Sequence, residues 1–263
     1  MAKAGCGPAA EACSLPGGSY QLALPEGAGP FPAVVFLHGY GGTGSGTMSN
    51  TGMVQTLLAR GYAVIAPDGQ AMTHGDGDDN GGGNGRSWDF LPDRPATRDE
   101  VAFIKSVADD AAARFDLDRQ RMLLAGFSIG GSMVSYLACK DPQAFAAYAP
   151  VAGSFWQPEP TACAGPVRLL QTHGWSDLTV PLEGRAIAED FVQGDVFQAM
   201  QTWRETSGCG TRPDDFSAPG EFRVRSWTDC QPGARIDFAL HFGGHSIPKG
   251  WATLALDWFE ALP

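Results

Sequence analysis

The residue in this chain best suited to nucleophilic chemistry is a serine at a strand-to-helix transition. Ser128 lies in Gly126-Phe-Ser-Ile-Gly130, between an apolar strand pattern and a small-residue helix pattern. Positions two residues either side of such a serine pass close to neighbouring backbone, which glycine tolerates. The turn lifts the hydroxyl out of the sheet and aims the N–H groups of the next helix toward it. The pattern predicts a nucleophile elbow; the alternative is an ordinary strand-to-helix turn.

A serine nucleophile needs a base, and the base needs a carboxylate that orients it. In chains with this elbow the three residues follow in the order serine, acid, histidine. His245 lies in a glycine-rich loop just past the last strand pattern and is the predicted base. His241 falls within that strand and is expected to be packed or hydrogen-bonded there. Asp177, in the loop after the strand that ends at His173, is the predicted acid, with turn formation as its alternative role.

Two backbone N–H groups are expected to stabilise a developing oxyanion. One belongs to Ile129, which follows the serine. The other belongs to Tyr40, in the turn His38-Gly-Tyr-Gly-Gly42 after an apolar strand pattern. We expect His38 itself to hold this turn by hydrogen bonds rather than to act as a base.

Aromatic side chains gather in the loops that are predicted to follow strands. They would line a cleft for an aromatic or bulky apolar acyl group, although single rings can instead pack on the core. Trp156 is the leading candidate for a substrate contact. The other candidates are Trp88, Phe155 and Trp175, with Tyr40 in the oxyanion turn.

A loop rich in glycine, aspartate and asparagine offers a candidate calcium site. Asp76, Asp78 and Asn80 match the first, third and fifth ligand positions of an EF-hand loop, and Gly81 matches the sixth. Ser87 stands where the bidentate glutamate is required, so a solvated turn cluster is the favoured interpretation and calcium the alternative. No other metal or cofactor is predicted.

Strand and helix patterns alternate, which predicts an α/β fold with a mostly parallel central sheet and helices on both faces. The 263 residues fit one domain, in which residues 1–18 form a disulfide-pinned segment. Strands are predicted at 19–24, 31–38, 62–66, 121–127, 148–152, 167–173, 222–227 and 236–241. Helices are predicted at 53–60, 98–115, 196–204 and 249–262, with a further helix that starts at the elbow.

The amino-acid composition limits the kinds of partner that the protein can bind and indicates the compartment in which it works. A net charge of −11 argues against nucleic acid as a partner, and no apolar run approaches the ~18 residues that cross a membrane. We therefore expect binding to neither nucleic acid nor membrane. We also expect a monomer. Six cysteines, without a Cys-x-x-Cys pair, predict a secreted or periplasmic protein with disulfides; reduced buried thiols are the alternative. Ala2-Lys-Ala4 looks like the tail of a cleavage site, which suggests a removed signal peptide.

Together these motifs resemble the α/β-hydrolase superfamily, and more closely its secreted bacterial enzymes of the polyhydroxybutyrate-depolymerase and feruloyl-esterase type. The resemblance covers most of the chain and includes, besides the elbow, Leu37-His-Gly-Tyr-Gly-Gly42, Ala66-Pro-Asp-Gly69, Arg86-Ser-Trp-Asp89, the His173-Gly…Asp177 turn and Gly243-Gly-His245. It implies a carboxylic ester hydrolase with a Ser-His-Asp triad and an acyl-enzyme intermediate. Aromatic, feruloyl-type esters or short hydroxyalkanoate and polyester esters would be its substrates.

Two other kinds of protein remain as alternatives. One is a lactone hydrolase or peptidase of the same fold; dienelactone-type enzymes usually carry a cysteine nucleophile, and Ser128 argues against them. The other is a non-catalytic binding protein with this fold. Such relatives typically lose a triad member, and this chain retains all three.

Six cysteines allow fifteen pairings, and the spacing proves none of them. Pairs between cysteines close in sequence would fix the N-terminal segment, brace the loop after the elbow helix, and close the segment between the helix at 196–204 and the last strand. The resemblance favours the same local pairing. The expected disulfides are Cys6–Cys13, Cys139–Cys163 and Cys209–Cys230.

Overall fold

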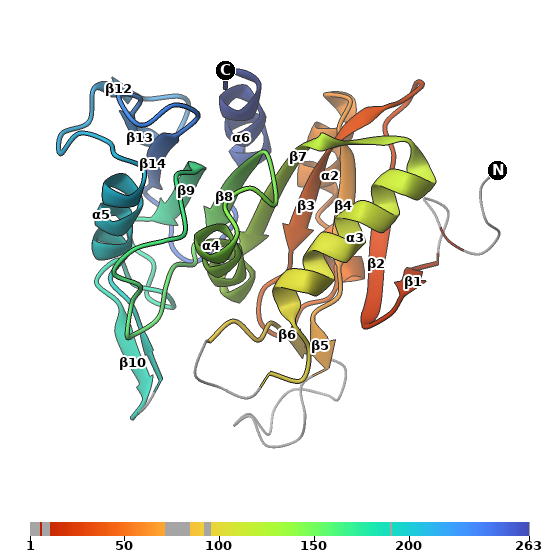
Figure 1. The fold of residues 1–263 in the computed structure, drawn as a ribbon, viewed down its shortest axis with the longest axis horizontal. Coiled ribbons are helices and arrows are strands. Elements are labelled where there is room, and N and C mark those ends of the chain that lie inside the picture. The colour runs from red at the N-terminus through yellow and green to blue at the C-terminus, as the bar shows by residue number, and fades with distance from the viewer. Residues whose placement is uncertain (1–5, 7–10, 72–84, 92–95, 190, 263) are drawn as a thin grey trace.

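The computed structural model of this chain describes residues 6, 11–71, 85–91, 96–189 and 191–262. Its central sheet contains β1 (Cys13–Leu15), β2 (Gly18–Ala23), β3 (Phe31–Leu37), β4 (Ala63–Pro67), β7 (Leu117–Phe127), β8 (Ala147–Val151), β9 (Arg168–Gly174), β12 (Asp215–Ser217), β13 (Arg223–Trp227) and β14 (Arg235–His241). The strand order is β1-β2-β4-β3-β7-β8-β9-β14-β13-β12 (Figure 1). Strands pair in parallel from β4 to β14 and antiparallel at both margins, which confirms the predicted mostly parallel sheet.

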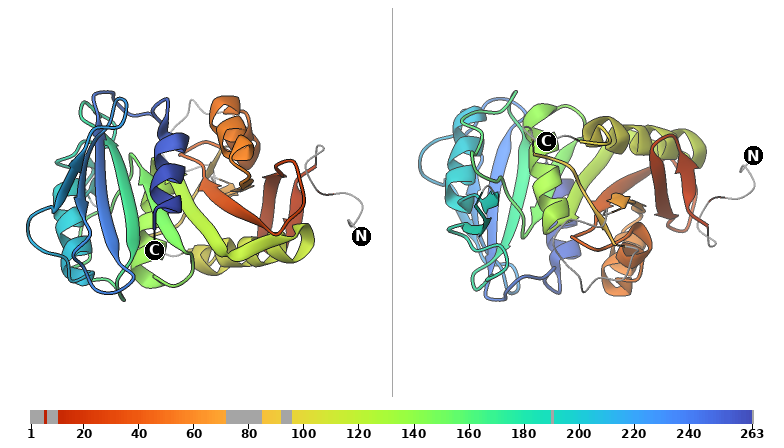
Figure 2. Two further views of the ribbon diagram at one scale, coloured as in Figure 1. Left: turned by 90° about the horizontal axis from the view of Figure 1, so that it is seen from above. Right: turned by 90° about the horizontal axis from the view of Figure 1, so that it is seen from below.

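Helices cover both faces of this sheet, as predicted (Figure 2). They are α1 (Gly44–Met48), α2 (Thr51–Ala59), α3 (Glu100–Phe115), α4 (Ile129–Lys140), α5 (Val196–Thr206) and α6 (Trp251–Glu260). Side chains of α3, α4 and α5 form the buried cluster on one face, and those of α2 and α6 form the cluster on the other. The central strands carry long apolar runs, as in β4, because both of their faces are covered. Among the described helices, none is both long and apolar enough to cross a bilayer.

The helix starts follow local side-chain chemistry. Asp99 accepts the Ala102 N–H at the start of α3, and Asp195 accepts the N–H groups of Phe197 and Gln198 at the start of α5. Each carboxylate satisfies N–H groups that lack an intrahelical partner. Asp195 is therefore the N-cap of α5.

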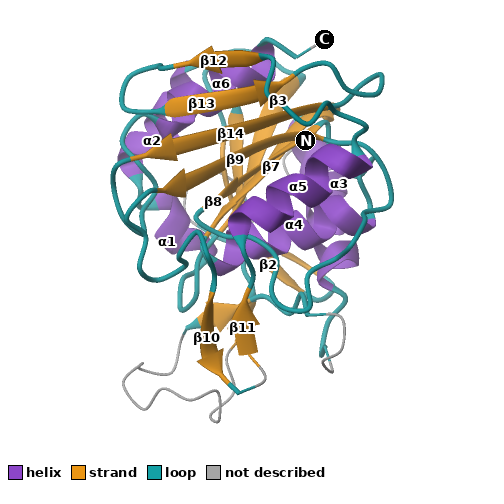
Figure 3. Ribbon diagram, turned by 90° about the vertical axis from the view of Figure 1, so that its left-hand side faces the viewer, coloured by secondary structure: helices purple, strands orange, loops and turns teal. Residues whose placement is uncertain are grey.

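Several short elements lie outside the predicted set. They are α1, β1, β12, β5 (Gln70–Ala71), β6 (Arg86–Ser87), β10 (Arg185–Ala188) and β11 (Phe191–Gln193). The β10–β11 hairpin projects from the end of the sheet at which β5 and β6 also lie (Figures 1 and 3). The strands of this hairpin have only four and three residues, so neither gives the longer apolar run by which the central strands are recognised.

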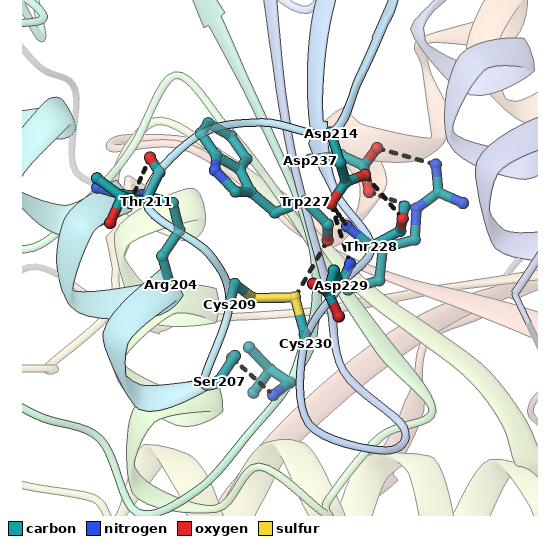
Figure 4. The surroundings of a disulfide bond; sticks show 12 residues. Arg204, Ser207, Cys209, Thr211, Asp214, Trp227, Thr228, Asp229, Cys230 and Asp237 are labelled. Atoms are coloured by element: carbon teal, nitrogen blue, oxygen red, sulfur yellow. Dashed lines mark hydrogen bonds and ion pairs between the residues drawn. A yellow bond between two sulfur atoms is a disulfide. The ribbon is translucent and has the colours of Figure 1, made fainter.

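Three disulfides close local loops, in the pairing expected from the sequence. They join the N-terminal segment to β1, the end of α4 to the segment before β9, and the turn after α5 to the β13–β14 hairpin (Figure 4). The bonds are Cys6–Cys13, Cys139–Cys163 and Cys209–Cys230. The second bond ties the elbow helix to the chain that leads into β9.

Candidate active site

Ser128 lies between β7 and α4, at the tight turn that the sequence predicts. Its backbone has φ 58° and ψ −123°, and non-glycine residues seldom adopt a positive φ. Two glycines permit the turn: a Cβ on Gly126 would lie 2.5 Å from the Gly130 carbonyl oxygen, and one on Gly130 would lie 2.5 Å from the His38 oxygen. The Ser128 N–H donates to the Val151 carbonyl at 2.9 Å. The elbow is therefore fixed to β8 and presents its hydroxyl at the carboxyl end of the sheet.

Ser128, His245 and Asp177 form one chain of hydrogen bonds. His245 Nε2 lies 2.8 Å from Ser128 Oγ, and His245 Nδ1 lies 2.8 Å from Asp177 Oδ2. Since an ionised carboxylate can only accept, Nδ1 carries the imidazole proton, and Nε2 accepts from the serine hydroxyl. The ring of Phe127 packs against the imidazole with the centroids 4.8 Å apart. The elbow and the loops after β9 and β14 thus bring the three predicted residues together.

The carboxylate of Asp177 is buried and held by the backbone of its own loop. Oδ1 accepts the N–H groups of Thr179 at 2.9 Å and Val180 at 2.8 Å, while Oδ2 faces His245. Burial raises the pKa of Asp177, but the hydrogen bonds from His245 and the loop outweigh burial, so the pKa lies below its ordinary value. Asp177 is therefore an anion at neutral pH.

Two buried polar side chains of β9 lie beneath Asp177. His173 Nε2 lies 2.8 Å from the Val180 carbonyl oxygen and 3.7 Å from Asp177 Oδ2. Gln171 Nε2 lies 3.3 Å from His173 Nδ1 and 3.0 Å from the Gly153 carbonyl oxygen. Burial lowers the pKa of His173, so the ring is neutral at pH 7. The sequence prediction gave neither side chain a role, because an apolar strand pattern does not reveal which polar groups meet beneath a loop.

Backbone contacts join the acid loop to the histidine loop. The Trp175 N–H donates to the His241 carbonyl at 2.7 Å, and the Ser176 N–H donates to the Gly243 carbonyl at 3.2 Å. The Ser176 hydroxyl also donates to the Phe242 carbonyl at 3.0 Å. His241 is buried, and its Nδ1 accepts the Gly243 N–H at 3.1 Å, so it is the hydrogen-bonded strand residue that we expected.

The turn after β3 lies against the elbow, where the oxyanion donors are predicted. A Cβ on Gly39 would lie 3.4 Å from Ser128 Cβ. The Tyr40 N–H donates to no acceptor within the described part of the chain. Ile129 is the first residue of α4, a position whose N–H has no intrahelical acceptor. Neither predicted donor therefore has an acceptor among the residues that the structure describes.

His38 holds this turn, as the sequence predicts. Its Nε2 accepts the Gly69 N–H at 2.9 Å, so Nδ1 carries the proton and donates to the Gly39 carbonyl at 2.8 Å. Trp88 Nε1 donates to the His38 carbonyl at 2.9 Å. Contrary to the prediction, Trp88 presents no face to a substrate, because its side chain is 2% exposed and supports the oxyanion turn from below.

Phe155 is a second correction to the predicted substrate contacts. Its side chain is 1% exposed, and its ring packs 5.2 Å from both Trp203 and Tyr136. The segment after β8 turns inward at this residue and joins the core beneath α4 and α5. Phe155 therefore stabilises the fold and offers no surface to a ligand.

Trp156, the leading predicted substrate contact, is also buried, contrary to the prediction, whereas two other predicted aromatic residues are exposed. Trp156 Nε1 lies 3.3 Å from Ser132 Oγ, and its ring lies 4.5 Å from that of Phe191, which leaves the side chain largely buried. Trp175 is 62% exposed and Tyr40 is 51% exposed. Leu178, on the loop of Asp177, and Phe242, on the loop of His245, are also exposed, and the sequence prediction did not include them.

The structure offers no support for a bound metal in the part that it describes. No group of three histidine, cysteine or acidic side chains converges there. The predicted calcium ligands Asp76, Asp78 and Asn80 lie outside the described residues.

Comparison with known proteins places this chain in a family. Residues 26–202 match the family described as Phospholipase/Carboxylesterase. Feruloyl esterase B of Piromyces equi is 25% identical over 83% of this chain, which covers 40% of that protein's length. The poly(3-hydroxyoctanoate) depolymerase of Pseudomonas fluorescens is 29% identical over 68% of this chain and 63% of its own length.

A solved structure shows the same fold. The acetyl xylan esterase from Aspergillus awamori superposes with a TM-score of 0.69 over 93% of this chain and 94% of its own, at 16% identity. The shared architecture is that of α/β-hydrolases, which confirms the predicted fold class. The chain therefore belongs to the phospholipase/carboxylesterase family and is a carboxylic ester hydrolase.

Proposed function

We propose that the chain hydrolyses carboxylic esters through an acyl-enzyme formed on Ser128. The observation that carries this proposal is the continuous hydrogen-bond chain from Ser128 Oγ through His245 to Asp177, with both links at 2.8 Å. A neutral imidazole that accepts the serine proton is what attack on an ester carbonyl requires. The positive-φ turn at Ser128 keeps the nucleophile in place before the substrate arrives.

The reaction divides into two steps. Ser128 Oγ attacks the carbonyl carbon as His245 Nε2 takes its proton, and the N–H groups of Tyr40 and Ile129 bind the oxygen that becomes negative. The imidazolium then gives the proton to the alkoxide leaving group, and the alcohol departs. Water hydrolyses the acyl-enzyme by the same route. Asp177 stabilises the imidazolium in both steps.

Aromatic, feruloyl-type esters are the substrates that we favour, with short hydroxyalkanoate esters second. Trp175 lies two residues from Asp177 with 62% of its side chain exposed, so a ring bound near Ser128 could stack on it. The name of the Piromyces equi relative supports the first class, and that of the Pseudomonas fluorescens relative supports the second. The three disulfides support export, and we propose a monomeric single-domain enzyme.

A hydrolysis screen tests this function. Wild-type protein and Ser128→Ala are compared on methyl ferulate, on 4-nitrophenyl esters of increasing acyl length and on soluble 3-hydroxyalkanoate oligomers. We expect turnover by the wild type alone, with the highest kcat/KM on the aromatic acyl ester. A Ser128→Ala variant as active as the wild type would contradict the mechanism. A preference for the hydroxyalkanoate oligomers would overturn only the substrate assignment.

A further inference from the structure

We propose that His173 is a positioning residue for ester hydrolysis, which holds the loop of Asp177 so that its carboxylate faces His245. This inference rests on the proposed function, since it needs Asp177 to be the acid. His173 touches neither the hydroxyl of Ser128 nor the ring of His245 in any contact that the structure shows. Its influence on the reaction therefore passes through the acid loop.

Val180 connects His173 to Asp177 through the two peptide groups that flank its Cα. Its N–H donates to Asp177 Oδ1 at 2.8 Å, and its carbonyl oxygen lies 2.8 Å from His173 Nε2. The backbone of Val180 is thus hydrogen-bonded on both sides: the Asp177 carboxylate accepts its N–H, and the His173 imidazole binds its carbonyl oxygen. Because the second oxygen of Asp177 makes the bond to His245, a shift of the Val180 backbone would turn the carboxylate away from the imidazole that it orients.

The tautomer of His173 is fixed by its neighbour on β9. Gln171 Nε2 lies 3.3 Å from His173 Nδ1, and an amide nitrogen can only donate, so Nδ1 is the unprotonated nitrogen. Nε2 therefore carries the hydrogen that binds the Val180 oxygen. The ring is neutral, so it places no second positive charge beside Asp177 Oδ2, from which Nε2 is 3.7 Å distant.

The same glutamine links the acid loop to the nucleophile. Gln171 Nε2 also donates to the Gly153 carbonyl at 3.0 Å. Gly153 packs directly on the elbow, since a Cβ there would lie 2.6 Å from the Ser132 N and would clash with the Ser128 carbonyl oxygen. The buried pair of His173 and Gln171 thus sets the acid loop against the backbone of the elbow.

Two substitutions at His173 separate its two nitrogens. In His173→Gln the side-chain amide reaches the position of Nε2 and can still donate to Val180. In His173→Asn the amide reaches only the position of Nδ1, so the donor to Val180 is lost. Tyr148→Phe is the matched control: Tyr148 is buried, and its hydroxyl donates to the Asp141 carbonyl at 2.9 Å in a loop at the other end of the sheet.

The assay is hydrolysis of a 4-nitrophenyl ester, with kcat expressed per active site titrated by an organophosphate, so that unfolded protein is not counted. We expect His173→Asn to lower kcat about ten- to a hundredfold with KM changed less than about twofold, because a displaced catalytic group costs rate rather than binding. His173→Gln should restore most of kcat. Tyr148→Phe should lower the melting temperature without changing kcat.

A double-mutant cycle with Asp177→Asn shows whether His173 acts through the acid. We expect His173→Asn to lower kcat less than about twofold when Asp177 is already asparagine. Equal losses in both backgrounds, or equal activity of the asparagine and glutamine variants, would overturn the inference. If Asp177→Asn alone leaves kcat unchanged, the proposed triad fails instead, so the two failures are distinguishable.

Discussion

The Asp177→Asn substitution removes one charge from the site and leaves the shape of the side chain unchanged. The asparagine amide can adopt two orientations, which differ in the positions of its oxygen and its NH₂ group. In the first, its oxygen keeps the N–H groups of Thr179 and Val180, and its NH₂ group faces His245 Nδ1. In the second, the oxygen faces His245, and the NH₂ group points at two backbone donors.

Hydrogen-bond energies decide between these orientations. The second leaves two buried N–H groups without acceptors, at about 1–3 kcal/mol each, or roughly 2–6 kcal/mol together. The first loses no hydrogen bond, because His245 can move its proton from Nδ1 to Nε2 and accept from the amide. The imidazole then directs an N–H at Ser128 Oγ and cannot take the serine proton. Such a wrong tautomer lowers kcat about 10⁴-fold in a triad of this kind.

The measurement is kcat and KM for a 4-nitrophenyl ester, beside Asp195→Asn as control. Asp195 also accepts two backbone N–H groups, at the start of α5, but asparagine caps a helix equally well. The Asp195 side chain makes no hydrogen bond to a residue of the triad. We expect a loss of about 10⁴ in kcat for Asp177→Asn and no loss for Asp195→Asn. A loss of less than about tenfold for Asp177→Asn would refute the tautomer argument.

Three further predictions concern the elbow, a disulfide and pH. Gly130→Ala places a Cβ 2.5 Å from a backbone oxygen and should lower both kcat and melting temperature, whereas Gly52→Ala, in open space on α2, should raise the melting temperature slightly. Removal of the Cys139–Cys163 bond, whose cysteines are 24 positions apart, should cost about 3 kcal/mol, or about 6–12 °C in melting temperature. Burial lowers the pKa of His173, so the unfolded chain binds a proton that the folded chain does not below about pH 6.5. Stability should therefore fall as pH drops from about 7 to 5, by calorimetry, and His173→Gln should weaken that dependence.

The parts of the site that the sequence predicts are those set by local geometry. Gly126 and Gly130 reveal the elbow because a side chain at either position would strike backbone within five residues or at the end of β3. The order of serine, acid and histidine along the chain, and the places where strand patterns end, then select Asp177 and His245. Central strands were predictable because burial on both faces gives them long apolar runs.

The misassigned parts depend on tertiary packing. Trp88 and Phe155 lie in loops after strands, as substrate contacts often do, yet both rings turn inward. Whether a loop tryptophan faces a cleft or the core depends on neighbours distant in sequence, such as the His38 carbonyl that Trp88 binds. The β10–β11 hairpin was missed because its strands, of four and three residues, are too short to show a period.

The nucleophilic role of Ser128 is the central claim, and covalent trapping tests it most directly. The protein is incubated with a fluorophosphonate, and the adduct is counted by intact-protein mass spectrometry and placed by peptide mapping. We predict one adduct per chain, on Ser128, formed in parallel with the loss of esterase activity and absent from Ser128→Ala. An adduct on another residue, or full inactivation without modification of Ser128, would contradict the account.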